Sequence, residues 1–224
     1  MLRTKILGKL GWPSSTTYDI PQDVVGKNIS GHYERGVNLA SQGLHGEALE
    51  ELKQAIAKDS NFAEAHHELG KTYRNLGLLK KAIKAYRAAL RIRPDHAEIY
   101  NDLGVAYDSL GDFVEAIKAY MWALRLKPNS VEVRINLGMV YYNIGSYCEA
   151  IKAFNQALQL KDDSAEAHYG LALVYIDLRH KESALEEHET LKSLGQVEVA
   201  AQLLDNIHSQ LWQQSSHEDS NKVD

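Results

Sequence analysis

Small and apolar residues recur along this 224-residue chain with a period of 34 residues. Four series share that spacing and phase: Gly36, Gly70, Gly104 and Gly138; Ala48, Ala82, Ala116, Ala150 and Ala184; Tyr73, Tyr107, Tyr141 and Tyr175; Ala55, Ala89, Ala123 and Ala157. Series that coincide in this way indicate internal repeats. The phase defines five repeats: 29–62, 63–96, 97–130, 131–164 and 165–198.

Each repeat is predicted to form two helices. In repeat 2, apolar residues follow helical spacing over AEAHHELGKTYRNLG and again over LKKAIKAYRAALRI. A glycine stands where each first helix should end and a left-handed backbone is needed, at Gly43, Gly77, Gly111 and Gly145. A capping box is predicted at the start of four repeats, because a glutamate follows three residues after Asn61, Asp95, Asn129 and Asp163.

This combination of small residues, aromatic residues and spacing resembles the tetratricopeptide repeat (TPR) family over about 170 of the 224 residues. The resemblance implies an all-α fold, a right-handed α-solenoid of five TPR helix-turn-helix units. Terminal repeats are expected to depart from the pattern, and they do so at Arg35, Leu39, Ala172, Arg179, His188 and Leu191. Segment 199–211 is amphipathic and is expected to form a C-terminal capping helix, followed by a disordered tail at 212–224.

In TPR proteins one side of each first helix lines a concave groove, and the resemblance carries four positions per repeat onto this chain. In repeat 1 these positions hold Tyr33, Val37, Ala40 and Ser41. The predicted groove residues of the other repeats are His67, Lys71, Arg74 and Asn75; Asn101, Val105, Asp108 and Ser109; Ile135, Met139, Tyr142 and Asn143; Tyr169, Leu173, Ile176 and Asp177. Unlike the scaffold positions, these residues change character between repeats, which indicates that they carry specificity.

The groove positions become apolar in repeats 4 and 5. We expect an exposed apolar floor there that binds the anchors of a partner peptide, formed by Ile135, Met139, Tyr142, Tyr169, Leu173 and Ile176. An acidic flank of the peptide could meet Lys71 and Arg74. The alternative is that the apolar residues pack beneath a neighbouring helix.

Composition narrows the function class. A formal charge of −5 and a pI near 6.1 argue against a general nucleic-acid binder. The single cysteine, Cys148, and the lack of a long apolar run favour a cytoplasmic protein. No phosphate loop, nucleophile motif or metal-ligand spacing is present, so a non-catalytic protein without cofactor or metal is expected. His66 and His67 do not alter this expectation, because adjacent helical residues diverge too far to share one ion.

Charge shifts along the chain. Repeat 2 carries eight Lys or Arg against three Asp or Glu, whereas repeat 5 carries three against seven. Four cations form a basic stripe on the outward side of the second helix of repeat 2: Lys80, Lys84, Arg87 and Arg91. A solvated face is favoured, and the alternative is a docking site for an acidic partner or another copy of the chain.

Residues 1–28 allow several interpretations. Leu2, Ile6, Leu7 and Leu10 can share one face of a short helix, which would make a weak membrane-surface anchor of residues 1–12. Membrane contact is not expected elsewhere, and two glycines and a length of three turns make the anchor marginal. Alternatively, the segment caps repeat 1, or TYDIPQDVV occupies a groove; capping or disorder is favoured. The predicted function is a protein-interaction adaptor that binds a peptide in the groove. The rival is a structural protein that self-associates by stacking or by exchange of N-terminal segments.

Overall fold

The computed structural model describes residues 30–212, and these residues form helices and no strand. The predicted N-terminal segment 1–28 and the tail after Trp212 lie outside the described residues. The helices are α2 (Ser30–Ser41), α3 (His45–Lys58), α4 (Ala63–Asn75), α5 (Leu79–Ile92), α6 (Ala97–Leu110), α7 (Phe113–Leu126), α8 (Val131–Asn143), α9 (Tyr147–Leu158), α10 (Ala165–Asp177), α11 (Lys181–Ser193) and α12 (Val197–Ile207), followed by a π-helical turn at His208–Trp212.

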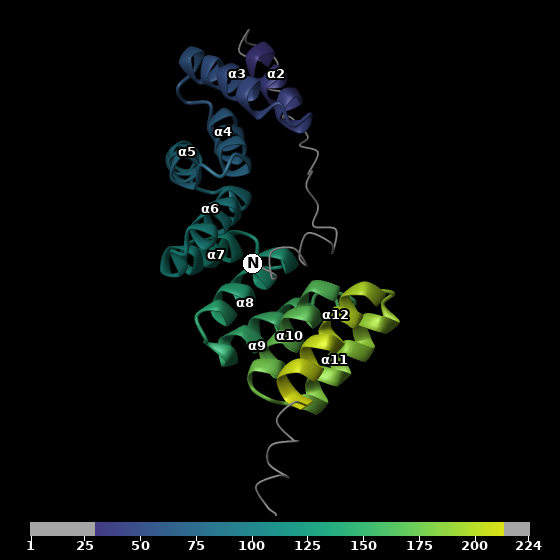
Figure 1. Ribbon diagram of the computed structural model, residues 1–224. Coiled ribbons are helices and arrows are strands. Elements are labelled where there is room, and N and C mark those ends of the chain that lie inside the picture. Colours follow the sequence, from purple (N-terminus) through teal and green to yellow (C-terminus); the bar gives the residue numbers. More distant parts are fainter. Residues whose placement is uncertain (1–29, 213–224) are drawn as a thin grey trace, which may run out of the picture. The chain divides into compact units, whose positions relative to one another are not determined.

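Consecutive helices pack as hairpins, one for each repeat (Figure 1). The pairs are α2 with α3, α4 with α5, α6 with α7, α8 with α9, and α10 with α11. Helix α12 follows the last pair and packs against α11 and α10. The prediction of an all-α fold built from five helix pairs and a C-terminal helix is therefore confirmed.

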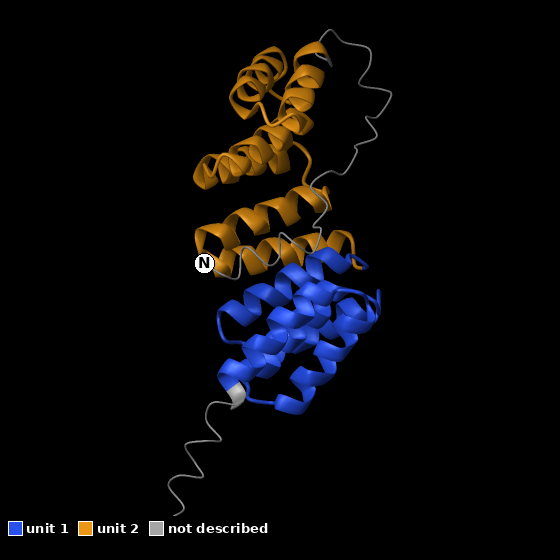
Figure 2. Cartoon of the chain, turned by 45° about the vertical axis from the view of Figure 1, so that its right-hand side comes forward, with its two compact units in different colours: residues 1–16, 129–224 blue, residues 17–128 orange. Residues whose placement is uncertain are grey.

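The chain divides into two compact units (Figure 2). Among the described residues, compact unit 2 contains α2–α7 and compact unit 1 contains α8–α12. Each has its own buried apolar side chains. Tyr86 and Tyr120 are fully buried in compact unit 2, and Phe154 is fully buried in compact unit 1.

The periodic glycines of the first helices let the two helices of a pair approach closely. In α6, a Cβ on Gly104 would lie only 2.6 Å from the Tyr120 ring of α7. In α4, a Cβ on Gly70 would lie 2.5 Å from the ring of Tyr86. In repeats 2 to 4 the buried aromatic residue of the second helix (Tyr86, Tyr120 or Phe154) thus occupies the space that a larger residue would need, which explains why the two positions recur together.

The turns within the pairs confirm the predicted left-handed glycines. Gly43, Gly77, Gly111 and Gly145 have φ angles of 79°, 72°, 82° and 75°. Repeat 5 has Arg179 at the same place, and its backbone is also left-handed, with φ 62°. A side chain there is disfavoured by sterics, so this turn carries local strain.

The predicted capping boxes are wrong by one residue. The N-cap positions are Phe62, His96, Ser130 and Ser164, each directly after the predicted capping residue. Only the Ser130 side chain of these four accepts a hydrogen bond from its helix, from the Val133 amide at 3.4 Å. The helices that begin after Phe62, His96 and Ser164 therefore start without a side-chain cap.

Candidate binding surface on the first helices

The predicted groove positions differ systematically in exposure. The first of the four is buried in every repeat: Tyr33, His67, Asn101, Ile135 and Tyr169. The last is exposed in every repeat: Ser41, Asn75, Ser109, Asn143 and Asp177. These two positions are eight residues apart, about 80° around the helix, so one lies towards the packed side and the other towards solvent.

The two middle positions are half-buried in the first three repeats. They hold Val37 and Ala40 in α2, and Lys71 and Arg74 in α4. In α6 they hold Val105 and Asp108. Compact unit 2 therefore presents a partly accessible row on α2, α4 and α6, ending at the exposed Ser41, Asn75 and Ser109.

The predicted exposed apolar floor in repeats 4 and 5 is wrong. Ile135, Tyr142, Tyr169, Leu173 and Ile176 are all buried, with 2–5% of their surface exposed. They belong to the core cluster of compact unit 1, and Met139 is half-buried against it.

Packing explains the error. Helix α10 contacts both α8 and α12, so the side that carries Tyr169, Leu173 and Ile176 belongs to a core shared with Leu203 and Ile207 of α12. The alternative interpretation, packing beneath a neighbouring helix, therefore describes these residues. Met139, Asn143 and Asp177 remain at least partly accessible in compact unit 1.

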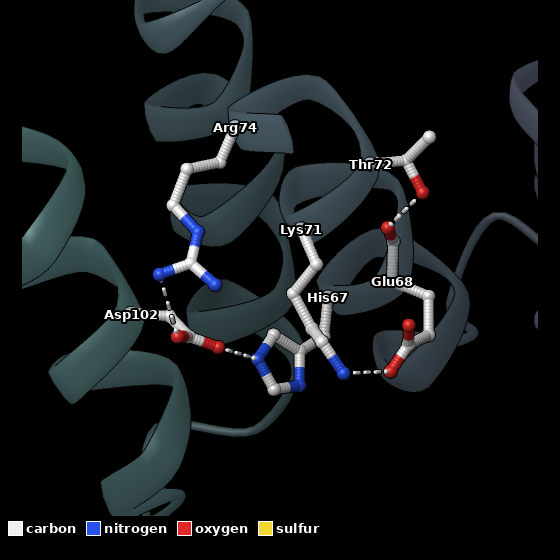
Figure 3. Close-up of polar contacts among 6 residues, drawn as sticks. All are labelled: His67, Glu68, Lys71, Thr72, Arg74 and Asp102. Atoms are coloured by element: carbon white, nitrogen blue, oxygen red, sulfur yellow. Dashed lines mark hydrogen bonds and ion pairs between the residues drawn. The ribbon is translucent and has the colours of Figure 1, made fainter. Parts of the chain in front are cut away.

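A cluster of polar side chains lies at and beside the predicted groove positions of α4 and α6 (Figure 3). The polar cluster consists of His67, Glu68, Lys71, Arg74 and Asp102. Nε2 of His67 lies 2.7 Å from Oδ2 of Asp102, and an Arg74 guanidinium nitrogen lies 3.6 Å from Oδ1 of the same carboxylate. Asp102 of α6 thus joins two side chains of α4.

The electrostatics of Asp102 follow from these contacts. Burial acts to raise the pKa of its carboxyl, but the hydrogen bond from His67 and the positive charges of His67, Arg74 and Lys71 outweigh it. The pKa of Asp102 therefore lies below its ordinary value of 3.8. The carboxylate is charged at neutral pH and compensates the cations beside it.

Lys71 is also paired within α4. Its Nζ donates to Oε1 of Glu68 at 2.8 Å, and Glu68 is buried. The predicted meeting of an acidic peptide flank with Lys71 and Arg74 is thus limited, because each cation has an acidic neighbour already. A ligand carboxylate there has to compete with Glu68 and Asp102.

A small pocket adjoins the polar cluster on the side of α2. Its lining residues are Tyr33, Ala63, Glu64, His67, Glu68, Arg93, His96 and Ile99. Glu64 and Arg93 form an ion pair across it. Burial, and then the charge of His67, lower the pKa of His96, which favours the neutral form of this imidazole. The pocket wall therefore combines charged, aromatic and aliphatic groups.

Sequence reasoning missed Glu68 and Asp102, although a signal for them exists. They stand 34 residues apart at one repeat position, which also holds Glu34 in repeat 1. An acid at the same position in three successive repeats, next to a groove position, indicates a partner for the groove cations. The position becomes Asn136 in repeat 4 and Gly170 in repeat 5.

The predicted basic stripe lies where expected, exposed on α5. Together with Ile83 and Ala88, its four side chains line a surface depression. Within residues 30–212 no group of three metal-ligating side chains converges on one point. No helix in this described stretch is long and apolar enough to cross a bilayer.

Comparison with known families supports the repeat assignment. A "Tetratricopeptide repeat" model matches residues 61–129, and a "TPR repeat" model matches residues 36–77 and 140–178. No curated protein matches the chain.

Solved structures share the fold at low sequence identity. MamA is 24% identical with a TM-score of 0.68, covering 73% of this chain and 95% of its own. YrrB, described as a TPR protein with an unusual peptide-binding site, is 22% identical with a TM-score of 0.66, covering 82% of this chain and 96% of its own. A thermophilic TPR protein from Thermus thermophilus is 22% identical with a TM-score of 0.62, covering 80% of this chain and 98% of its own.

Proposed function

Since the chain belongs to the tetratricopeptide repeat family, a protein-interaction fold, we propose that it is a non-catalytic adaptor that binds a peptide segment of a partner protein. The bound segment lies along the accessible groove positions of α2, α4 and α6. The proposal places the protein in a reducing compartment such as the cytoplasm, which suits its exposed free Cys148. It assigns no nucleic acid, cofactor or metal to the chain.

The observation that carries this proposal is the division of α4 into two sides. Gly70 faces the Tyr86 ring of α5, which fixes one side of the helix against its partner. Lys71, Arg74 and Asn75 are accessible to different degrees at the predicted groove positions. A first helix held rigidly by its pair, with polar groups on accessible positions, suits recognition of an extended segment.

The exposed residues supply the chemistry that such a segment needs. Asn75 and Ser109 stand 34 residues apart at one repeat position, and both can donate and accept hydrogen bonds. Groups of this kind can pair with the amides and carbonyls of an extended main chain. Val37 and Val105 offer apolar contact beside them. YrrB, which has the same fold, is described as having a peptide-binding site, and this makes the groove a reasonable place to test.

The proposal is tested with a peptide-display selection against the full chain, followed by fluorescence anisotropy on the selected peptides. Asn75→Ala removes one hydrogen-bonding group from the accessible row and is expected to weaken binding by about threefold to tenfold. Asn155→Ala is the matched control, because Asn155 is also exposed but lies on a second helix, α9. Its affinity should equal that of the wild type.

Two results would overturn the proposal. One is the absence of any selected peptide that binds in solution. The other is an equal loss of affinity in Asn75→Ala and Asn155→Ala, since the effect would then not depend on the groove positions. Circular dichroism of both variants verifies that their helix content is unchanged.

A further inference from the structure

Helix α5 differs from the other second helices in its charge. Its 14 residues contain five Lys or Arg and no Asp or Glu. The basic stripe, Lys80, Lys84, Arg87 and Arg91, is fully on the exposed side. None of the four forms an ion pair with any residue between 30 and 212; Arg87 instead lies over the Tyr107 ring at 5.7 Å.

Helix α11 carries the opposite charge at the same repeat positions. Three glutamates of α11 lie 102 residues, or three repeat periods, after three cations of α5: Glu182 after Lys80, Glu186 after Lys84, and Glu189 after Arg87. All three glutamates are exposed and form an acidic stripe. Within the described part of the chain, Glu189 contacts His188 and Lys192, whereas no ion pair involves Glu182 or Glu186.

The other second helices do not concentrate charge in this way. The corresponding positions of α3 hold Gly46, Glu50 and Lys53, and those of α9 hold Cys148, Lys152 and Asn155. At these positions of α7 the charged residue is Lys118, which pairs with Glu115 of the same helix. Opposite charges in equal spacing thus occur on α5 and α11 alone among the second helices of residues 30–212.

We propose that the basic stripe of α5 docks on the acidic stripe of α11 in a second copy of this chain. Each copy carries both stripes, so the basic stripe of one copy is available to the acidic stripe of another. Equal spacing along the two helices lets the three charge pairs form together. The contact involves second helices, so it is independent of peptide binding on the first helices.

Electrostatics predicts how this association behaves. Exposed charge pairs are individually weak, so a stripe-to-stripe dimer is expected to be reversible and to dissociate as salt is added. The net charge of −5 opposes association of two copies in general. Charge complementarity at a defined place is therefore needed for the dimer to form.

The central pair gives a test that does not depend on helix orientation. Lys84 and Glu186 form the middle one of the three proposed charge pairs, so they face each other whether α5 and α11 run parallel or antiparallel. Lys84→Glu alone, and Glu186→Lys alone, place like charges in contact. The double variant restores opposite charges with the two residues exchanged.

Sedimentation velocity of the full chain, at about 20 mM and about 500 mM salt, measures the dimer directly. We expect a concentration-dependent dimer at low salt that dissociates at high salt. Each single variant should raise the dissociation constant by at least about tenfold, and the double variant should recover most of it. Lys152→Glu and Glu149→Lys on α9 make the same charge changes at exposed positions elsewhere and should leave dimerisation unchanged.

Three outcomes would overturn the proposal. They are a wild type that stays monomeric at low salt, a double variant no better than the singles, and controls that weaken the dimer as strongly as the stripe variants. All variants change exposed residues, and circular dichroism checks that they fold. Because Asn75→Ala should dimerise like the wild type, failure here and failure of the peptide proposal are distinguishable.

Discussion

His168 and Glu187 tie α10 to α11 through a short contact, with Nδ1 of the imidazole 2.6 Å from Oε2 of the carboxyl group. The other ring nitrogen, Nε2, lies 2.9 Å from the carbonyl oxygen of Asp162. A carbonyl only accepts, so Nε2 must carry a proton and donate it. The other ring nitrogen, Nδ1, then faces the carboxyl group of Glu187.

Repeat 1 contains the same contact at the same repeat positions. Nδ1 of His32 lies 2.7 Å from Oε2 of Glu51. The surroundings of the two carboxyl groups differ, however. Burial raises the pKa of Glu187, whereas hydrogen bonds from His32 and then Arg35 lower the pKa of Glu51. The contributions of these two equivalent pairs to stability should therefore depend on pH in opposite directions.

We predict that glutamine at these two positions changes stability in opposite ways with pH. A raised pKa means that the contribution of Glu187 is fully present below its ordinary value of 4.5 and is lost as pH rises through the folded pKa. Wild type should thus lose stability relative to Glu187→Gln as pH rises above about 4.5. For Glu51, with its lowered pKa, wild type should gain relative to Glu51→Gln as pH rises towards that value. Urea unfolding at a series of pH values measures both, and slopes of the same sign would contradict the assignment.

Close approach of paired helices predicts a large effect for a single methyl group. Gly104→Ala places a Cβ 2.6 Å from the Tyr120 ring, so one of the two helices must shift. We expect the free energy of unfolding to fall by about 1–3 kcal/mol, as in other overpacked cores. Gly46→Ala in α3 is the control, because a Cβ there meets nothing within 4 Å. It should be neutral or stabilise by up to about 1 kcal/mol, and a similar loss in both variants would argue against the steric explanation.

The left-handed turn of repeat 5 predicts a stabilising substitution. Arg179 has φ 62°, where the other four repeats have glycine. Arg179→Gly should raise the free energy of unfolding by about 1 kcal/mol, because glycine adopts this backbone without a steric penalty. Arg179→Ala keeps the Cβ and should show no such gain. Thermal and urea unfolding of the two variants compare the effects directly.

Repeat spacing predicts much of the fold because it follows directly from helix geometry. Gly70 and Tyr86 recur with their counterparts in repeats 3 and 4, since a Cβ on the glycine would clash with the ring that faces it. Gly111 and its equivalents recur because each turn needs a left-handed residue. In both cases the residues involved belong to the same repeat, so the sequence pattern of one repeat is enough to predict them.

Exposure could not be predicted in the same way, because it depends on neighbouring helices. Helical spacing correctly places Tyr169 and Leu173 on one side of α10, but only the packing of α8 and α12 decides that this side is buried. The contact between His67 and Asp102 likewise joins two repeats. A pattern within each repeat does not contain these relationships.

Because the residues of the predicted apolar floor are buried, truncating their side chains should lower stability. Ile176 is 2% exposed within the core of compact unit 1, so Ile176→Ala should lower the free energy of unfolding by about 2–5 kcal/mol. Met139 is half-buried, and Met139→Ala should cost clearly less. If Ile176→Ala were as stable as wild type, Ile176 would belong to an open surface after all.

Asp102 is expected to affect both the free energy of unfolding and the positive charge that Arg74 offers to a ligand. Asp102→Asn removes the carboxylate that compensates Arg74 and accepts from His67, so we expect a loss of about 1–3 kcal/mol in the free energy of unfolding at neutral pH. Because the pKa of Asp102 is lowered, its contribution is present above its ordinary value of 3.8 and is lost as pH falls through the folded pKa. The difference between wild type and Asp102→Asn should therefore shrink in acid.

The same variant leaves Arg74 without its neighbouring negative charge, so peptides with an acidic flank should bind Asp102→Asn more tightly than wild type. Glu149→Gln removes a carboxylate of equal charge from the exposed surface of α9 and is the control for net charge. Unfolding curves and anisotropy titrations on the same preparations test both effects. If Asp102→Asn lowers the free energy of unfolding but binds peptides with an acidic flank no more tightly than wild type, Arg74 does not contact the bound segment. Asp102 would then have a structural role only.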